Sequence, residues 1–145
     1  MAGLTDMAGW LHHIVITVSD LGVSTQFYDQ VLTLIGFRRI RDVPEGPLWA
    51  GERIEVGLQE ARSGHARNHD RYSPGLHHLA FGAPDHAAVD RMYQALVSLG
   101  VEILDPPTTY DRYSLGYYAV FFADPDGIKL EYVYTPMADR MSGMQ

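Results

Sequence analysis

The chain has 145 residues, a formal net charge of -7 at pH 7 and no cysteine. Its length suits one ordinary globular domain, and the missing cysteines exclude disulfide bonds, thiolate metal sites and a cysteine nucleophile. The acidic balance argues against a nucleic-acid binder, which needs a basic face. Because there is neither a run of about eighteen apolar residues nor an N-terminal secretory signal, we expect a cytoplasmic protein with no nucleic-acid or membrane partner.

The first half of the chain predicts a strand, a helix and three further strands. A β-branched run makes residues 11–19 a strand. Apolar residues at spacings of four, four and three then predict a helix, which Asp20 or Ser24 caps and Gly36 ends. Strands follow over 37–43, weakly over 48–50 after a turn at 44–47, and over 53–60. The apolar residues of the helix are Val23, Phe27, Val31 and Leu34.

The second half predicts the same order of elements. A strand is expected over 76–82, followed by a helix that Asp85 caps and Gly100 ends. Three more strands are predicted over 101–104, 117–122 and 128–134, with a Pro-rich loop after the first and a turn at 124–127 before the last. The apolar face of the helix consists of Val89, Met92, Leu96 and Leu99.

The two halves also share sequence at their first and last strands. Leu11-His12-His13 matches Leu76-His77-His78, and Arg53-Ile54-Glu55 matches Lys129-Leu130-Glu131. The repeat predicts an α+β fold of two paired β-α-β-β-β modules in a single domain. We place module one at about 10–60, a linker at 61–74 and module two at about 75–135, with flexible ends at 1–9 and 136–145.

Strand alternation assigns four polar residues to one face. Side chains two residues apart in a strand share a face, so the apolar positions of each strand pack on the helix and the intervening positions face away. His12 and His77 are expected on the helix side, in structural roles. The face away from the helices carries His13, Glu55, His78 and Glu131, beside the small residues Thr17, Gly57, Ala80 and Gly82.

These four residues are predicted to hold a metal ion. Two imidazoles and two carboxylates suit a divalent metal such as Zn, Ni, Co, Mn or Fe(II), without indicating which. The repeat supports the assignment because it superposes His13 on His78 and Glu55 on Glu131. The expected partner is a small-molecule substrate or ligand.

Two sets of basic residues lie near the predicted site. The segment between the modules carries Arg62, His65, Arg67, His69 and Arg71, which we interpret as a solvated linker, with a loop that attracts an anionic substrate as the alternative. Arg53 and Lys129 each precede a predicted ligand by two residues and share its face. We interpret these two as solvated strand ends, with groups that hold an anionic substrate as the alternative.

The chain resembles the vicinal oxygen chelate superfamily, which contains glyoxalase I, bleomycin-resistance proteins and extradiol dioxygenases. The resemblance covers about residues 10–135 and is specific for fold but not for reaction. The stretches that carry it include Leu11 to Leu21, Gln26 to Leu32, Pro74 to Phe81 and Phe122 to Glu131.

The resemblance implies a cupped mixed sheet around a divalent metal held by His13, Glu55, His78 and Glu131. It also implies a homodimer. For a glyoxalase-type lyase or isomerase, the metal binds two vicinal oxygens of the substrate and stabilises an enediolate. Glu131 or Glu55 then acts as the catalytic base.

Two alternatives stay open. An Fe(II) extradiol dioxygenase needs two histidines and one carboxylate, which His13, His78 and Glu131 supply without Glu55. A bleomycin-resistance-like protein instead binds a drug or metabolite without catalysis, and tyrosines or a tryptophan then line its cavity. The candidate lining residues are Trp49, Tyr110, Tyr113, Tyr117 and Tyr118.

Overall fold

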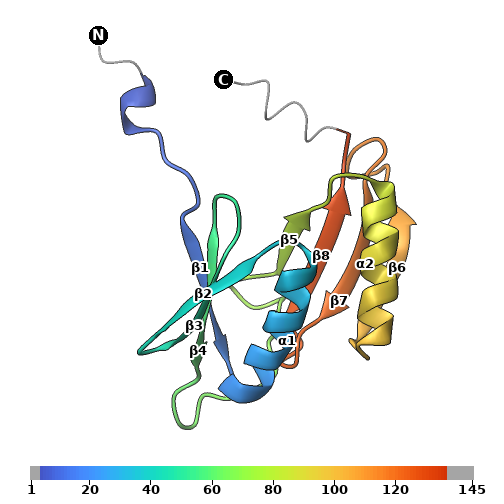
Figure 1. Cartoon of the computed structure of the whole chain (residues 1–145). Helices are drawn as coiled ribbons and strands as arrows, with labels where there is room; N and C mark the ends of the chain where they lie inside the picture. The colour runs from blue at the N-terminus through green and yellow to red at the C-terminus, as the bar shows by residue number, and fades with distance from the viewer. Residues whose placement is uncertain (1–3, 137–145) are drawn as a thin grey trace. The chain divides into compact units, whose positions relative to one another are not determined.

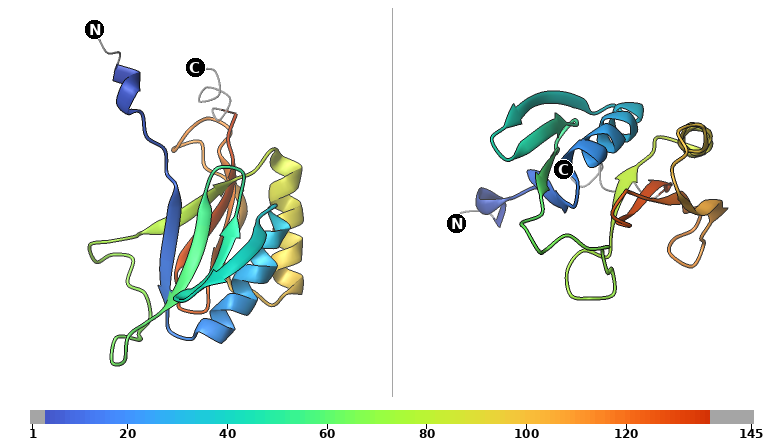
Figure 2. Two further views of the ribbon diagram at one scale, coloured as in Figure 1. Left: turned by 60° about the vertical axis from the view of Figure 1, so that its left-hand side comes forward. Right: turned by 90° about the horizontal axis from the view of Figure 1, so that it is seen from below.

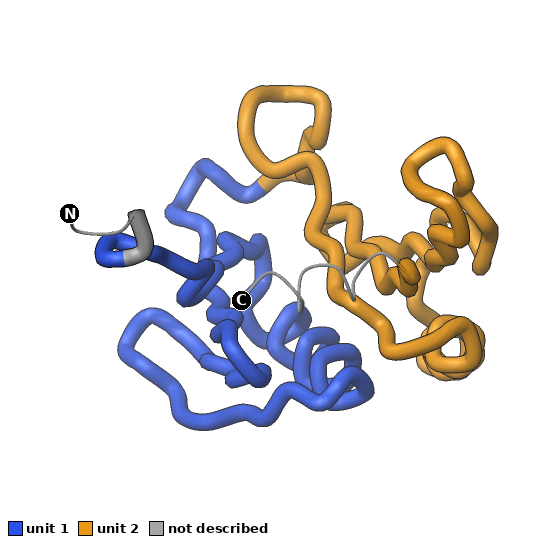
Figure 3. Tube along the Cα trace, turned by 90° about the horizontal axis from the view of Figure 1, so that it is seen from above, with its two compact units in different colours: residues 1–66 blue, residues 67–145 orange. Residues whose placement is uncertain are grey.

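Strand pairing gives both halves of the chain the same topology in the computed structural model, which describes residues 4–136. The chain divides into two units, residues 1–66 and 67–145 (Figure 3). The ends predicted to be flexible, 1–9 and 136–145, are described only in part. The first contains a 3-10 turn, Leu4–Met7, whereas 1–3 and 137–145 lie outside the described residues.

Unit 1 is a four-stranded mixed sheet with one helix (Figure 1). Its strands lie in the order β1-β4-β3-β2, with β1 parallel to β4 and the other neighbours antiparallel. The elements along the chain are β1 (His13–Val18), α1 (Leu21–Leu34), β2 (Arg38–Val43), β3 (Gly46–Ala50) and β4 (Glu55–Glu60).

Unit 2 repeats this arrangement. Its sheet has the order β5-β8-β7-β6, again with one parallel pair, β5 and β8, and antiparallel pairing elsewhere. The elements are β5 (His78–Gly82), α2 (His86–Ser98), β6 (Ile103–Thr109), β7 (Tyr118–Ala123) and β8 (Lys129–Tyr134). The predicted fold class, two β-α-β-β-β modules, is therefore confirmed.

Both helices begin and end where the sequence predicts. The carboxylate of Asp20 accepts a hydrogen bond from the Val23 amide at 3.0 Å, and the carboxylate of Asp85 accepts one from the Ala88 amide at 2.7 Å. These bonds satisfy amide groups that have no partner inside a helix. At the other end, Gly100 has a φ of +73°, a left-handed conformation that costs glycine little.

Each helix covers one face of its own sheet (Figure 2). In unit 1, the buried Trp49 donates its indole N–H to Asp29 of α1 at 2.8 Å, so Val56, its register partner in β4, faces the helix too. In unit 2, Tyr118 of β7 donates to Asp90 of α2 at 2.6 Å. Burial of each large apolar side chain on these faces contributes about 1.5–3 kcal/mol. The opposite face of each sheet carries the predicted His and Glu residues.

Two strands differ from the prediction. β3 starts at Gly46, inside the predicted turn. Glycine permits this because the backbone there lies close to β4, and a Cβ at this position would be 2.2 Å from the Leu58 carbonyl oxygen. β6 continues through Pro106 and Pro107, which we expected in a loop. An edge strand tolerates proline, since the missing N–H can point away from the sheet, and β6 is an edge strand with two register shifts.

Neither helix could span a membrane. Over residues 4–136, no helix is both long and apolar enough to cross a bilayer.

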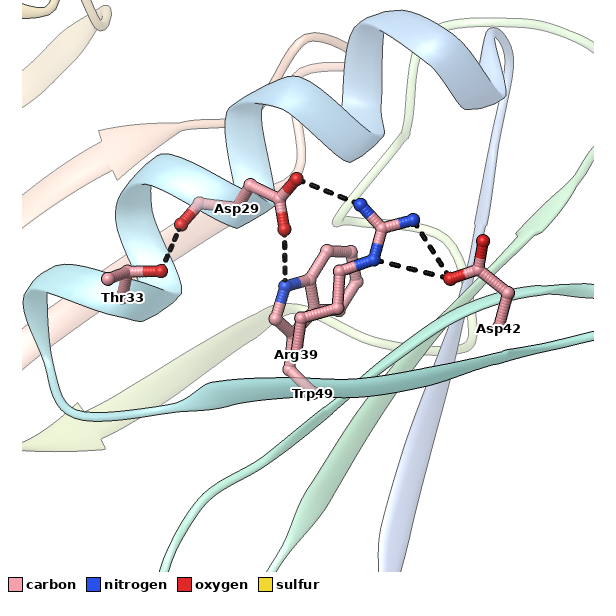
Figure 4. Close-up of polar contacts among 5 residues, drawn as sticks. All are labelled: Asp29, Thr33, Arg39, Asp42 and Trp49. Carbon is pink, nitrogen blue, oxygen red and sulfur yellow. Dashed lines mark hydrogen bonds and ion pairs between the residues drawn. The ribbon is translucent and has the colours of Figure 1, made fainter.

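A polar network joins α1 to the first sheet (Figure 4). One carboxylate oxygen of Asp29 accepts the Trp49 indole N–H, and the other accepts from Arg39 at 3.0 Å. Arg39 also donates from Nε and Nη2 to the same oxygen of Asp42. Trp49 is fully buried, so Asp29 gives its N–H the partner that burial requires.

The network predicts different effects for two substitutions of Asp29. Asp29→Ala leaves the buried indole N–H without an acceptor, and we expect it to lower the free energy of unfolding by about 1–3 kcal/mol. Asp29→Asn keeps a carbonyl acceptor and loses only an exposed ion pair, worth about 0–1 kcal/mol. Urea denaturation of both variants measures the difference, and equal losses would contradict this role for Asp29.

Candidate functional site

Glu131 in unit 2 is a buried carboxylate held at both oxygens. Only 1% of its surface is exposed. Nε2 of His78 lies 3.0 Å from Oε1, and the Tyr117 hydroxyl donates a short hydrogen bond to Oε2. Burial of a carboxylate is costly unless its oxygens find donors. His78 and Tyr117 therefore both satisfy this group and fix its orientation.

Strand register explains why these side chains meet. In the parallel pair β5–β8, His78 lies opposite Lys129 and Ala80 lies opposite Glu131, while Phe121 of β7 is the other neighbour of Glu131. Side chains at 78, 80, 121, 129 and 131 consequently share the face away from α2. The small side chain of Ala80 leaves room for His78 to reach the carboxylate. The structure thus brings together His78 and Glu131, as strand alternation predicts.

Tyr117 is a neutral hydrogen-bond donor at ordinary pH. Burial, reinforced by its bond to the Glu131 carboxylate, raises the pKa of its phenol well above the usual value of 10. From the sequence, Tyr117 is expected only as a candidate lining residue. Its hydrogen bond to Glu131 is consistent with strand alternation, because residues 117, 119 and 121 are two apart and share the face that carries Glu131.

The second histidine of each Leu-His-His motif is hydrogen-bonded to the first. Nδ1 of His77 lies 2.8 Å from Nδ1 of His78, and Nδ1 of His12 lies 2.9 Å from Nδ1 of His13. The expectation that His12 and His77 pack toward the helices is wrong: both are exposed and precede the strands. Each orients its neighbour, as hydrogen-bonded groups orient histidines at metal sites.

In unit 1, Glu55 lies beside His13 but in a different setting from Glu131. The two residues are register partners on the face away from α1. Among the residues that the structure describes, the Glu55 carboxylate makes no hydrogen bond or ion pair, and the side chain is half-buried. Unit 1 therefore offers a free carboxylate, and unit 2 offers a fixed one.

The register corrects one expectation from the repeat. His13 lies opposite Glu55, whereas its counterpart His78 lies opposite Lys129. Glu55 is therefore equivalent to Lys129, and Gly57 is the residue equivalent to Glu131. Local sequence similarity does not fix register; here Leu48 occupies the space beside Gly57, where an added Cβ would lie 2.7 Å from its side chain.

An aromatic cluster covers the sheet next to Glu131. It consists of Tyr110, Tyr113, Tyr117 and Phe121, with ring centroids 5.3–6.4 Å apart in the contacting pairs. Of the other candidate lining residues, Trp49 is buried against α1, and Tyr118 faces α2, where it stacks on His86 at 4.2 Å. Only three of the five candidates therefore share the face that carries Glu131.

The donors in unit 2 are suitable for a divalent metal. Nitrogen and oxygen ligands bind such ions at about 2.0–2.2 Å. If the angle between two ligand bonds at the metal is about 90°, the two ligand atoms then lie about 3 Å apart. The 3.0 Å between His78 and Glu131 meets this requirement. Within either unit, however, residues 4–136 contain no group of three or more potential ligands. Each unit, taken by itself, holds one such pair: His13 and Glu55 in unit 1, and His78 and Glu131 in unit 2.

Known proteins match this chain over most of its length. The profile of the Glyoxalase/Bleomycin resistance protein/Dioxygenase superfamily matches residues 10–132. The uncharacterized protein YqjT of Bacillus subtilis (strain 168) is 34% identical over 95 residues, which are 65% of this chain and 74% of that protein.

Solved structures agree with the fold. A Bacillus halodurans protein provisionally named a glyoxalase is 28% identical, with a TM-score of 0.76 over 90% of this chain and 99% of that one. A glyoxalase/bleomycin resistance protein from Albidiferax ferrireducens T118 is 24% identical, with a TM-score of 0.71 over 86% and 98% of the two chains. The latter match supports the fold alone. The family resemblance predicted from the sequence is confirmed.

The contacts of Glu131 predict that Tyr117 stabilises the fold through its hydroxyl. Tyr117→Phe removes one of two donors from a buried carboxylate, so the free energy of unfolding at pH 7 should fall by about 1.5–3 kcal/mol. Tyr113→Phe is the control, because that hydroxyl is exposed and contacts Arg112; we expect a change within about 0.5 kcal/mol. Denaturant titration that finds the two variants equally stable would refute the assignment.

Proposed function

This chain belongs to the Glyoxalase/Bleomycin resistance protein/Dioxygenase superfamily, and from this membership and its two His–Glu pairs we propose that it is a metal-dependent lyase or isomerase of glyoxalase type. Its substrate is a small molecule with two vicinal oxygens. The metal is held by His13, Glu55, His78 and Glu131, through units of one chain or of two copies in a homodimer. When bound, it supplies Lewis-acid polarisation of the substrate oxygens.

The observation that carries this proposal is the different setting of the two glutamates. Glu131 is buried, and both its oxygens are engaged, so it suits a fixed ligand. Glu55 is half-buried, and its carboxylate has no partner among the described residues. A general base must reach a proton and carry it. We therefore assign to Glu55 the transfer of a proton from the carbon beside the substrate carbonyl and its return to the adjacent carbon.

The roles of the histidines follow from their neighbours. A histidine ligand must be neutral, with one nitrogen toward the metal and the other oriented by a hydrogen bond. The Nδ1 contacts from His77 and His12 leave Nε2 of His78 and His13 as the ligating atoms. On this proposal, the paired histidines set which nitrogen of each ring faces the site.

The assignment predicts that the change to glutamine affects metal binding and turnover differently at Glu55 and at Glu131. Glu55→Gln should retain bound metal within twofold and lower turnover by about 10²–10⁴. Glu131→Gln should lose most of the metal as well as the activity. Metal content is measured by mass spectrometry, and proton transfer by solvent deuterium uptake into the hemithioacetal of methylglyoxal. Loss of metal and activity together in Glu55→Gln would contradict its role as base.

One observation favours a second function, Fe(II) extradiol dioxygenase. Gly57 occupies the register position of Glu131 in unit 1, so the ligands at matching positions reduce to His13, His78 and Glu131. Two histidines and one carboxylate form the set that non-haem iron oxygenases use. Oxygen consumption with catechol by the Fe(II)-loaded protein, together with no deuterium uptake, would select this function over the first.

A further inference from the structure

Lys129 lies on the same face as Glu131 and next to His78. It is two residues from Glu131 in β8 and is the register partner of His78 in β5. Its ammonium nitrogen lies 4.3 Å from the centre of the Phe121 ring, and Phe121 neighbours Glu131 in the sheet. The side chain therefore lies across the site face. It is not the solvated strand end that we expected from the sequence.

The charge of Lys129 is not neutralised by the protein. Over residues 4–136, no carboxylate forms an ion pair with it. Glu131, which shares this face, already lies 3.0 Å from Nε2 of His78 and accepts a hydrogen bond from Tyr117. A cation held against an aromatic ring and without a counter-ion is suited to bind an anion supplied from outside.

Other positive groups surround this position. Arg71 lies in the segment that leads into β5, close in sequence to His77 and His78. Arg71 itself lies 5.1 Å over the ring of Tyr72, which contacts His77. These positive groups lie close together although the chain as a whole has a net charge of -7. Local concentration of one sign of charge attracts ligands of the opposite sign.

The aromatic cluster beside Lys129 adds apolar ring surface. The ring of Tyr110 meets that of Phe121 edge-on at 5.6 Å. Tyr113 and Tyr117 extend the cluster, and Arg112 lies over Tyr113 at 4.9 Å. Aromatic side chains offer favourable contacts to planar groups. Cations thus flank an aromatic surface at two sides.

We propose that Lys129 is a specificity-determining residue and that the substrate is a planar, carboxylate-bearing molecule whose carboxylate binds the Lys129 ammonium. This inference rests on the proposed function only in taking the face of Glu131 as the site of substrate binding. The vicinal oxygens lie at the His–Glu groups, and the planar part contacts the aromatic cluster.

Two probes that differ only in charge test the inference. Both 3,4-dihydroxybenzoate and 3,4-dihydroxybenzamide carry vicinal oxygens, but only the first carries a carboxylate. Their dissociation constants are measured by calorimetry with zinc-loaded and with chelator-treated protein. The variants are Lys129→Met, which removes the charge, Lys129→Arg, which keeps it, and Arg53→Met, which removes the charge two residues before Glu55.

We expect the parent protein to bind the acid at least about tenfold more tightly than the amide, the ratio that one charge-assisted hydrogen bond provides. Lys129→Met should abolish this preference and change amide binding less than twofold. Lys129→Arg should keep most of the preference, and Arg53→Met should keep all of it. Equal affinities in the parent, no binding of either probe, or equal loss of both probes in Lys129→Met would overturn the inference.

The metal-free protein separates this inference from the proposed function. A Lys129-dependent preference for the acid that persists without metal supports the subsite even if no metal binds to the protein. Conversely, if Glu55→Gln shows the expected loss of deuterium uptake while the acid and the amide bind equally, the Lys129 inference is contradicted and the proposed function stands.

Discussion

The buried carboxylate of Glu131 is the constraint on which the candidate site depends. A charged group with 1% of its surface exposed is tolerated only where donors replace the lost water. Here Tyr117, from the segment that enters β7, donates a hydrogen bond, and Nε2 of His78 from the parallel neighbour β5 lies 3.0 Å from the other oxygen. This one side chain therefore contacts residues from both neighbouring strands and from the aromatic cluster. The same contacts fix a carboxylate oxygen next to an imidazole.

Duplication has produced two units of one topology with different chemistry. Unit 1 keeps the paired histidines but places its glutamate directly beside His13, and no donor among residues 4–136 holds that carboxylate. Unit 2 shifts the glutamate by two residues and puts Lys129 in the equivalent position. Unit 1 thus has a carboxylate without a partner among the described residues, and the carboxylate of unit 2 is held by two neighbours. A strictly symmetric pair would contain two equally fixed carboxylates and no free one.

Much of the fold could be predicted because local signals are strong. Asp20 and Asp85 cap the helices as expected, and the β-branched alternation of β1 correctly separates His13 from the core. Register could not be predicted, since it depends on how Leu48 packs beside Gly57 across two strands. The contacts of Tyr117 and Lys129 with their neighbours could not be predicted for a similar reason. Their partners, Glu131 and Phe121, lie on other strands or at a distance along the chain, and spacing alone does not reveal the contact.

The spectrum of the Co(II)-substituted protein tests the central claim most directly. We predict one cobalt per chain, X-ray absorption that requires two imidazole ligands, and loss of one imidazole contribution in each of His13→Ala and His78→Ala. His12→Ala and His77→Ala should retain both ligands and change only the affinity. A spectrum without imidazole scattering, or one that only the His12 and His77 variants alter, would contradict the account.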